Sequence, residues 1–188
     1  MTEQVNAEEI REVYIKADLL FDENDVQQAL NRIALEISSD LAGSDPIIMP
    51  VMNGGMVIAG HLLTRLNFPL EVDYLHATRY RNTTSGNELE WKTTPNIALQ
   101  DRVVVVVDDI YDEGHTLAAI IKHIQEAGAT KVLTAVLLDK KHDRKAYSEL
   151  KLNYVGFEIE DRYVFGYGMD YKGYWRNAPG IFAVKEKP

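Results

Sequence analysis

The densest group of residues able to do chemistry lies at positions 103–116, in the segment VVVVVDDIYDEGHT. Two acids, Asp108 and Asp109, close a run of five valines, and their carboxylates can accept hydrogen bonds from sugar hydroxyls. The polar residues that follow open an apolar helical run, where free backbone N–H groups attract a phosphate; they are Glu113, Gly114, His115 and Thr116. Gly114 is small and Thr116 carries a hydroxyl, so a phosphate can approach this turn closely. The spacing therefore indicates a site for a sugar phosphate.

The valine run indicates which secondary-structure elements position this site, because no polar residue alternates with its five valines. Such a run cannot face water on either side, so it predicts the central strand of a parallel sheet. Ligands of open α/β sheets bind at the carboxyl ends of the strands, and this strand ends at the two acids. The chain has 188 residues, which suits one domain, residues 1–188, with a sheet of about five or six strands covered by helices on both faces.

Three other interpretations compete for the central segment. A buried strand ending in two acids is also typical of the magnesium-holding strand of P-loop NTPases, but the chain contains no G-x-x-x-x-G-K-[ST] motif. An EF-hand loop needs a glutamate at its twelfth position, which counted from Asp108 is Ala119. A plain helix start favours acids anyway, and this explains the acids but not their combination with Gly114 and Thr116.

The composition narrows the function classes. The chain carries 29 acids against 20 lysines and arginines, a formal net charge of −9, so long-range attraction to nucleic acid or to an anionic membrane is not expected. An anionic ligand must then be held by local means, which are helix N-termini, a few cations or a metal ion. There is no cysteine, the polar start does not resemble a signal sequence, and no apolar run approaches the ~20 residues that span a bilayer. We expect a soluble, cytoplasmic protein.

The rest of the chain predicts further helices and strands. Residues 8–21 and 25–41 have apolar side chains at helical spacing, which predicts two amphipathic helices packed on a sheet face, the second capped by Asn24 or Asp25. Another helix is expected at 116–128. Strands are expected at 46–52, 70–78, 131–138, 155–159, 162–167 and 181–184, the last as an edge strand.

Three segments have alternative interpretations. After the strand at 46–52 comes a candidate anion-binding turn, or a simple tight turn into a helix, formed by Asn53, Gly54 and Gly55. Residues 79–91 are polar, contain glycine and lack apolar periodicity, which predicts either a mobile lid loop or a surface β-hairpin. The mixed-charge run Lys141–Lys145 is typical of a solvated loop.

Two segments carry a resemblance to a known family. Asp108–Thr116, DDIYDEGHT, resembles the phosphoribosyl-diphosphate signature of type I phosphoribosyltransferases, and Tyr163–Arg176 is similar to the matching segment of their hypoxanthine-guanine branch. The resemblance implies an α/β fold with a mainly parallel sheet, helices on both faces, a mobile lid loop and a small C-terminal hood. It also implies magnesium-dependent transfer of a phosphoribosyl group from 5-phosphoribosyl 1-diphosphate to hypoxanthine or guanine. The products would be diphosphate and IMP or GMP, and the enzyme a homodimer or homotetramer.

The resemblance implies a role for each site residue. Ribose binding is expected at Asp108 and Asp109, and 5′-phosphate binding at Glu113, Gly114, His115 and Thr116. Diphosphate binding is expected at Asn53, Gly54, Gly55, Arg79, Tyr80 and Arg176, with Mg²⁺ at Asp170. Base binding is expected at Lys140, Tyr163 and Val164. Asp112 lies on the turn that faces the base and is our candidate general base.

The chain departs from the family pattern at several of these positions. Asn53 stands where the family usually has lysine, and we hypothesise that Arg79, in place of a serine, supplies the missing cation. Glu113 and His115 replace the usual Ser or Thr and Lys; an inward carboxylate would repel the phosphate, so we expect Glu113 to turn outward. The family tends to hold the peptide corresponding to Met52–Asn53 in cis. A phosphoribosyltransferase for xanthine, adenine or a pyrimidine, and a non-catalytic regulator, stay open as alternatives.

Overall fold

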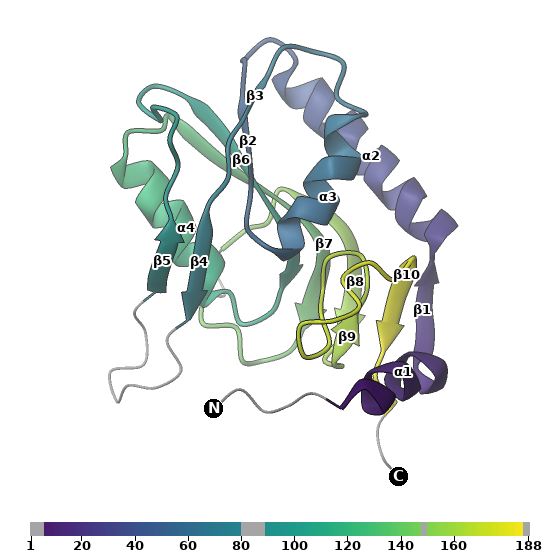
Figure 1. Cartoon of the computed structure of the whole chain (residues 1–188). Coiled ribbons are helices and arrows are strands. Elements are labelled where there is room, and N and C mark those ends of the chain that lie inside the picture. The colour runs from purple at the N-terminus through teal and green to yellow at the C-terminus, as the bar shows by residue number, and fades with distance from the viewer. Residues whose placement is uncertain (1–5, 80–88, 148–149, 186–188) are drawn as a thin grey trace.

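The fold centres on a five-stranded sheet in which all neighbouring strands are parallel (Figure 1). The computed structural model describes residues 6–79, 89–147 and 150–185, without the side chains of Arg79 and Leu89. The strand order is β3 (Glu71–Val72), β2 (Ile47–Pro50), β6 (Val103–Tyr111), β7 (Lys131–Lys141) and β8 (Tyr154–Glu160). The valine run is therefore the central strand, as predicted, and its side chains at 104–107 are fully buried.

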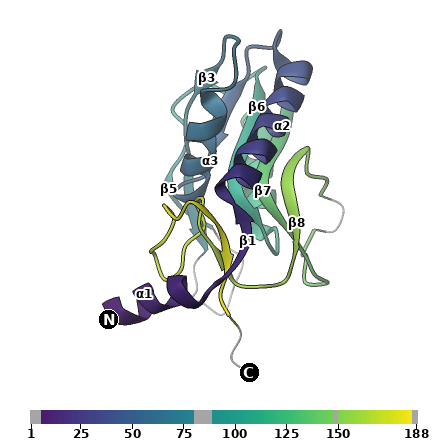
Figure 2. The ribbon, with the colours of Figure 1, turned by 90° about the vertical axis from the view of Figure 1, so that its right-hand side faces the viewer.

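Helices cover both faces of this sheet. Val105 and Val107 pack with α2 (Glu23–Leu41) and α3 (Gly54–Leu63), whereas Val104 and Val106 pack with α4 (His115–Glu126) on the other face. Figure 2 shows α2 and α3 lying side by side over one face. In the described part of the chain, no helix combines the length and the apolar composition that crossing a bilayer requires.

A smaller antiparallel sheet lies beside the carboxyl ends of the central strands and forms the expected hood. Its order is β1 (Asp18–Asp22), β10 (Gly180–Ala183) and β9 (Val164–Phe165), and α1 (Ala7–Lys16) rests on it. The prediction that residues 181–184 form an edge strand was therefore wrong. β10 is central because the N-terminal strand β1 pairs with its free side.

Three predictions about the first helices were also wrong. The first helix ends at Lys16 rather than at 21, because Ala17 is extended and the next residues pair with β10. It packs on the hood through Tyr14 and not on the main sheet. The second helix is capped by Asp22 rather than by Asn24 or Asp25, since Asp22 and Asp25 each accept the other's backbone N–H in a capping box.

The strand expected at residues 70–78 is divided into β3 and β4 (His76–Arg79). The chain bends between them at buried Asp73, whose carboxylate accepts the backbone N–H groups of Tyr74, Asn96 and Ile97. β4 pairs with β5 (Leu89–Thr93) in an antiparallel ladder. This pairing agrees with the hairpin interpretation of the segment, whereas most of the expected lid, residues 80–88, lies outside the described residues.

Candidate active site

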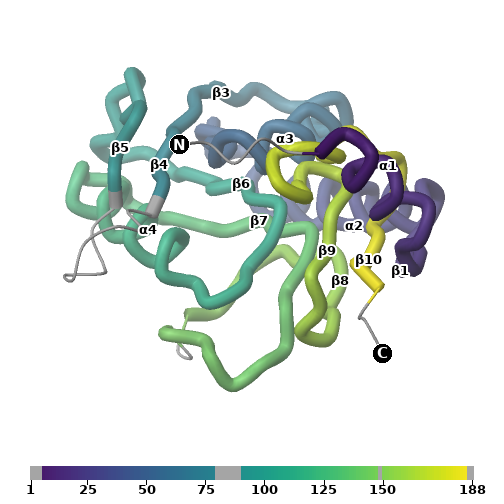
Figure 3. The backbone as a smooth tube through the Cα atoms, turned by 60° about the horizontal axis from the view of Figure 1, so that its bottom comes forward, coloured from purple at the N-terminus to yellow at the C-terminus, as the bar shows by residue number. Residues whose placement is uncertain are grey.

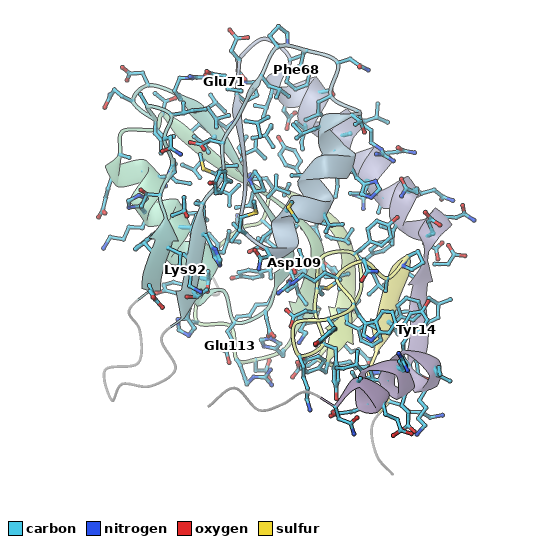
Figure 4. The ribbon with its side chains drawn as sticks, in the orientation of Figure 1. Tyr14, Phe68, Glu71, Lys92, Asp109 and Glu113 are labelled. Atoms are coloured by element: carbon cyan, nitrogen blue, oxygen red, sulfur yellow. The ribbon has the colours of Figure 1, made fainter. Side chains whose placement is uncertain are left out.

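The sugar-phosphate motif lies where β6 ends and α4 begins. Asp108 and Asp109 are the last polar residues of the strand, and Figure 4 places Asp109 below the start of α3, with Glu113 farther along the following loop. Gly114 caps α4 with φ of +86°, and a Cβ there would lie 2.6 Å from the Tyr111 ring. Only glycine fits this turn, which leaves the first N–H groups of α4 open to an anion.

A second turn, at the start of α3, packs directly on the end of β6. A Cβ added to Gly54 would lie 1.9 Å from Oδ2 of Asp109, so the backbone approaches the acid as closely as glycine allows. The Met52–Asn53 peptide is cis, as the resemblance implied. A hood residue, Gly168, lies on this turn in the same way, with its Cβ position 2.5 Å from the Gly54 carbonyl oxygen. Three segments distant in sequence thus meet around one carboxylate.

Two hood residues extend toward this meeting point. Arg176 pairs with Oδ1 of Asp170, donates to the Gly168 carbonyl at 2.5 Å and lies 3.7 Å from Oδ2 of Asp109. The other oxygen of Asp170 accepts the Gly173 N–H at 2.7 Å. Arg176 is therefore the cation that links the hood to the acids of the sheet.

These segments enclose a cavity of about 580 Å³. Its walls come from the two strand-to-helix turns and from the hood. The lining residues are Val51, Met52, Asn53, Gly54, Asp108, Asp109, Ile110, Tyr111, Asp112, Glu113, Gly114, His115, Thr116, Leu117, Asp170 and Arg176. The cavity thus joins most of the residues predicted to bind ribose, phosphate and diphosphate.

Ionisation of the two carboxyl groups near the end of β6, Asp108 and Asp109, is energetically unfavourable in the free protein. Burial raises the pKa of Asp108 well above its ordinary value, and the neighbouring charge of Asp109 adds to this rise. Burial also raises the pKa of Asp109, against the opposing hydrogen bond with Asp108 and the charge of Arg176. Hydroxyl donors or cations entering the cavity would relieve this cost. The pair is therefore suited to a polyhydroxyl ligand.

Asp112 has a different environment, because basic side chains surround its carboxylate. Nζ of Lys140 donates to Oδ2 at 3.0 Å, and Nε2 of His142 lies 2.7 Å from Oδ1. Nζ of Lys140 is also 3.7 Å from Oδ1 of Asp161, which pairs with Arg144 at 2.5 Å. Burial would raise the pKa of Asp112, but the hydrogen bonds from Lys140 and His142 outweigh it and hold that pKa below the ordinary value.

The acids near the cavity differ in how well they fit a metal ion. Within the described ranges, Asp112, His142 and Asp161 bring ligand atoms within 4.8 Å of one another. The Lys140 ammonium already lies between the two acids, so a second cation there would be repelled. Asp170 lines the cavity and keeps its side chain 31% exposed. Carboxylate oxygens are ligands that magnesium prefers, and Asp170 can offer them to an ion in the cavity once the Arg176 guanidinium, which pairs with it, moves away.

The residues expected at the base lie beside the cavity rather than in its walls. Lys140 is not among the residues that line the cavity, but its ammonium donates a hydrogen bond to Asp112, which is. The Tyr163 ring is exposed, and its hydroxyl donates to the Asp170 carbonyl at 3.3 Å. The Val164 side chain is buried in the core, so only its backbone faces outward from β9. The Arg79 side chain and Tyr80 lie outside the described residues.

Sequence reasoning missed two contributors to this site. Residues 141–145 were interpreted as a solvated loop, yet the His142 side chain is only 5% exposed and contacts Asp112. The signal was present, because residues two apart on a strand face the same side, and Lys140 and His142 are two apart. Asp161 gave no comparable signal. Its place beside Lys140 comes from the pairing of β7 with β8.

The N-terminal helix, to which no chemistry was assigned, braces the hood segment between Asp170 and Arg176 (Figure 3). Glu9 accepts hydrogen bonds from the Tyr171 hydroxyl at 2.8 Å and from Nζ of Lys172 at 2.6 Å. Farther along the same helix, Tyr14 stacks on Trp175 with ring centroids 4.6 Å apart.

A parallel sheet with an acidic pair and an anion-binding turn at its carboxyl end, closed by a hood, defines a sugar-phosphate-binding α/β protein of the type I phosphoribosyltransferase class. The family model for the phosphoribosyl transferase domain matches residues 17–172. A hypoxanthine-guanine-xanthine phosphoribosyltransferase of Tritrichomonas foetus is 31% identical over 168 residues, which cover 89% of this chain and 91% of the relative. A hypoxanthine-guanine phosphoribosyltransferase of Bacillus subtilis is 29% identical, covering 89% of this chain and 92% of that protein.

A comparison with a solved structure supports the same family. The crystal structure of a hypoxanthine-guanine phosphoribosyltransferase from Bacillus anthracis superposes with a TM-score of 0.81 and 28% identity, covering 90% of this chain and 97% of that one. The chain therefore belongs to the phosphoribosyltransferase family, in the branch whose members are named hypoxanthine-guanine phosphoribosyltransferases. The predicted family and fold class are confirmed.

Proposed function

We propose that this protein transfers a phosphoribosyl group from 5-phosphoribosyl 1-diphosphate to hypoxanthine or guanine, releasing diphosphate and IMP or GMP. The observation that carries the proposal is the convergence of Asp109, Asp112 and Asp170 with the N-terminus of α4 on one cavity. The names of the relatives from T. foetus and B. subtilis support the same reaction and the same bases. In this role the protein belongs to purine salvage.

The charges in the cavity suit this transfer. Breaking the bond at the anomeric carbon develops positive charge on the ribose ring and negative charge on the leaving diphosphate. Asp108 and Asp109 hold the ribose hydroxyls and place negative charge beside the ring, while Arg176 and the Gly54–Gly55 turn face the diphosphate. Fixed charges of the right sign at both ends stabilise the transition state without reorganisation.

The 5′-phosphate rests on the N–H groups at residues 113–116, with the Thr116 hydroxyl as a further donor. Glu113 contributes only its backbone N–H. Its carboxylate turns away from the phosphate, because two negative charges at such short range would repel each other. His115 adds a polar side chain to the same wall.

The base is chosen by Lys140, whose ammonium donates to the 6-oxo oxygen of the purine. Adenine carries an amino group at that position, so a buried ammonium would face a donor, and such unpaired groups discriminate strongly. Tyr163 offers an exposed ring on which the purine can stack, and its side chain is 54% exposed. Val164 reads the purine edge through its backbone, because its side chain is in the core.

Asp112 acts as the general base, accepting the proton that the purine loses as its nitrogen attacks the anomeric carbon. Its lowered pKa keeps the carboxylate ionised at neutral pH, so it is ready to accept a proton. The same lowering makes it a weak base. Because Lys140 bonds both Asp112 and the purine oxygen in this scheme, binding of the base redistributes the ammonium between two acceptors.

Magnesium, when bound, neutralises the diphosphate and makes it a better leaving group. Asp170 would hold this ion, since magnesium commonly binds through one or two carboxylates and the substrate phosphates. Arg176, which pairs with Asp170 in the free protein, would then be available to face the diphosphate. Asn53 and the Arg79–Tyr80 pair complete the diphosphate site.

A panel of free bases tests the proposal. The purified protein is incubated with 5-phosphoribosyl 1-diphosphate, Mg²⁺ and one of hypoxanthine, guanine, xanthine, adenine or uracil, and the nucleotide is measured. We expect IMP and GMP to form, and no product when EDTA is added. If only another base gave a nucleotide, that base would replace hypoxanthine and guanine as the proposed substrate. If no base gave a nucleotide, the result would favour a non-catalytic regulator. We also propose that the protein is cytoplasmic, that it consists of one domain, and that it forms a homodimer or homotetramer.

A further inference from the structure

We propose that His142 is a positioning residue for the reaction, which holds the Asp112 carboxylate in place by donating its Nε2–H to Oδ1. This inference rests on the function proposed above, in which Asp112 accepts the proton of the base. His142 touches no substrate in this scheme and acts only through Asp112. The contact is 2.7 Å long, and the His142 side chain is 5% exposed.

The hydrogen bonds of the imidazole fix where its proton lies. Nδ1 accepts the backbone N–H of Arg144 at 3.1 Å, so this nitrogen carries a lone pair. The neutral ring must then carry its hydrogen on Nε2, which points at Asp112. His142 is therefore a donor to Oδ1, in the same way that Lys140 is a donor to Oδ2.

The two donors together orient the carboxylate. Lys140 is the penultimate residue of β7 and His142 is the residue just after that strand, so each oxygen of Asp112 is held by a different side chain. The charged groups facing His142 are Asp112, Lys140, Asp161 and Arg144, and all four are joined by ion pairs. When Lys140 shifts toward the purine oxygen, His142 is the donor that keeps Asp112 from rotating.

Kinetics of His142→Ala test this role. We expect kcat to fall about tenfold, the order expected for one lost hydrogen bond to a charged group. The Michaelis constant for 5-phosphoribosyl 1-diphosphate should stay within about twofold, because the phosphate turn is untouched. The acidic limb of the kcat/KM profile for the base should move to higher pH. His142→Gln, whose amide can also donate, should restore most of the loss, and Asp143→Asn serves as an exposed neighbouring control.

A double mutant separates positioning from general structural damage. In an Asp112→Asn background, His142→Ala should lower kcat by less than about twofold, since its effect passes through the carboxylate. A full additional tenfold loss would overturn the proposal. So would an unchanged kcat and pH profile for His142→Ala in the otherwise native chain.

NMR of the ¹⁵N-histidine-labelled wild-type protein gives a readout that needs no turnover and no variant that must fold. We expect the His142 ring of the wild-type protein to show a protonated Nε2 and an unprotonated Nδ1, as its hydrogen bonds require. The opposite tautomer would overturn the proposal even in an active enzyme. If no base is converted to a nucleotide but this tautomer is found, the proposed function fails while the His142–Asp112 pairing stands.

Discussion

The guanidinium of Arg176 lies 3.7 Å from Oδ2 of Asp109, although one residue belongs to the hood and the other to the central strand. The same guanidinium pairs with Asp170. One cation thus pairs with an acid on each side of the cavity and connects the hood to the central sheet. The residues proposed to bind ribose and diphosphate are therefore linked electrostatically in the free protein.

Asp112→Asn should lower kcat by about a hundred- to ten-thousandfold, the usual worth of a general base. The amide keeps the shape of the side chain but cannot accept the proton. Binding of 5-phosphoribosyl 1-diphosphate, measured by calorimetry, should be largely retained because Asp112 faces the base. Turnover close to that of the wild type would remove Asp112 from the role of base.

Asp108→Asn should stabilise the free protein at neutral pH while abolishing activity. Burial and the charge of Asp109 raise the pKa of Asp108 in the folded state above its unfolded value, so the ionised form destabilises the fold. This cost is present above the raised pKa and is relieved as the pH falls through it. Each kcal/mol removed should raise the Tm by about 2–4 °C at pH 8. Calorimetry over a series of falling pH values should show the gain shrinking once the pH passes below the raised pKa, and a gain independent of pH would contradict this explanation.

Lys140→Met should reduce kcat/KM for hypoxanthine by roughly a hundredfold, as expected for a lost charged hydrogen bond of about 2.7 kcal/mol. The ratio of hypoxanthine to adenine activity should fall with it. Lys141→Met is a matched control on the same strand, because the Lys141 ammonium pairs with Asp139 and Glu158 instead. Equal losses in both variants would show that Lys140 has no specific role with the base.

Tyr14→Ala should loosen the hood segment that carries Asp170 and Arg176. The Tyr14 ring stacks on Trp175, and its removal should cost about 1–3 kcal/mol of stability and raise the Michaelis constant for 5-phosphoribosyl 1-diphosphate. Ile15→Ala is the control on the same helix, since Ile15 is 78% exposed. Thermal unfolding and steady-state kinetics measure the two effects. A lower Tm with an unchanged Michaelis constant would limit α1 to a structural role.

Arg79→Ala tests whether this residue supplies the cation missing at Asn53. We expect the Michaelis constant for 5-phosphoribosyl 1-diphosphate to rise about tenfold, the value of one charged contact. Asn53→Lys in the same background should recover part of the loss. If Arg79→Ala leaves both the Michaelis constant and kcat unchanged, the compensation hypothesis is abandoned.

The amino-acid sequence alone determined the centre of this protein. Five valines can be buried on both faces only in a covered parallel sheet, and the acids, Gly114 and the helix that follow them are contiguous in the chain. The strand, the turn and the helix that follows it were therefore predictable from local chemistry. The family was predictable for the same reason, because its signature lies within that segment.

Only the tertiary structure decided which distant residues meet that segment. Because residues 18–22 pair with β10, the first helix ends early and β10 lies in the middle of its sheet. Which strands pair depends on segments far away in the chain, so the local sequence could not predict it. His142 was interpreted as solvated because its charged neighbours face water, yet the end of β7 places it against Asp112. Pairing between distant strands, and not local propensity, sets such contacts, since burial and charge compensation are properties of the assembled sheet.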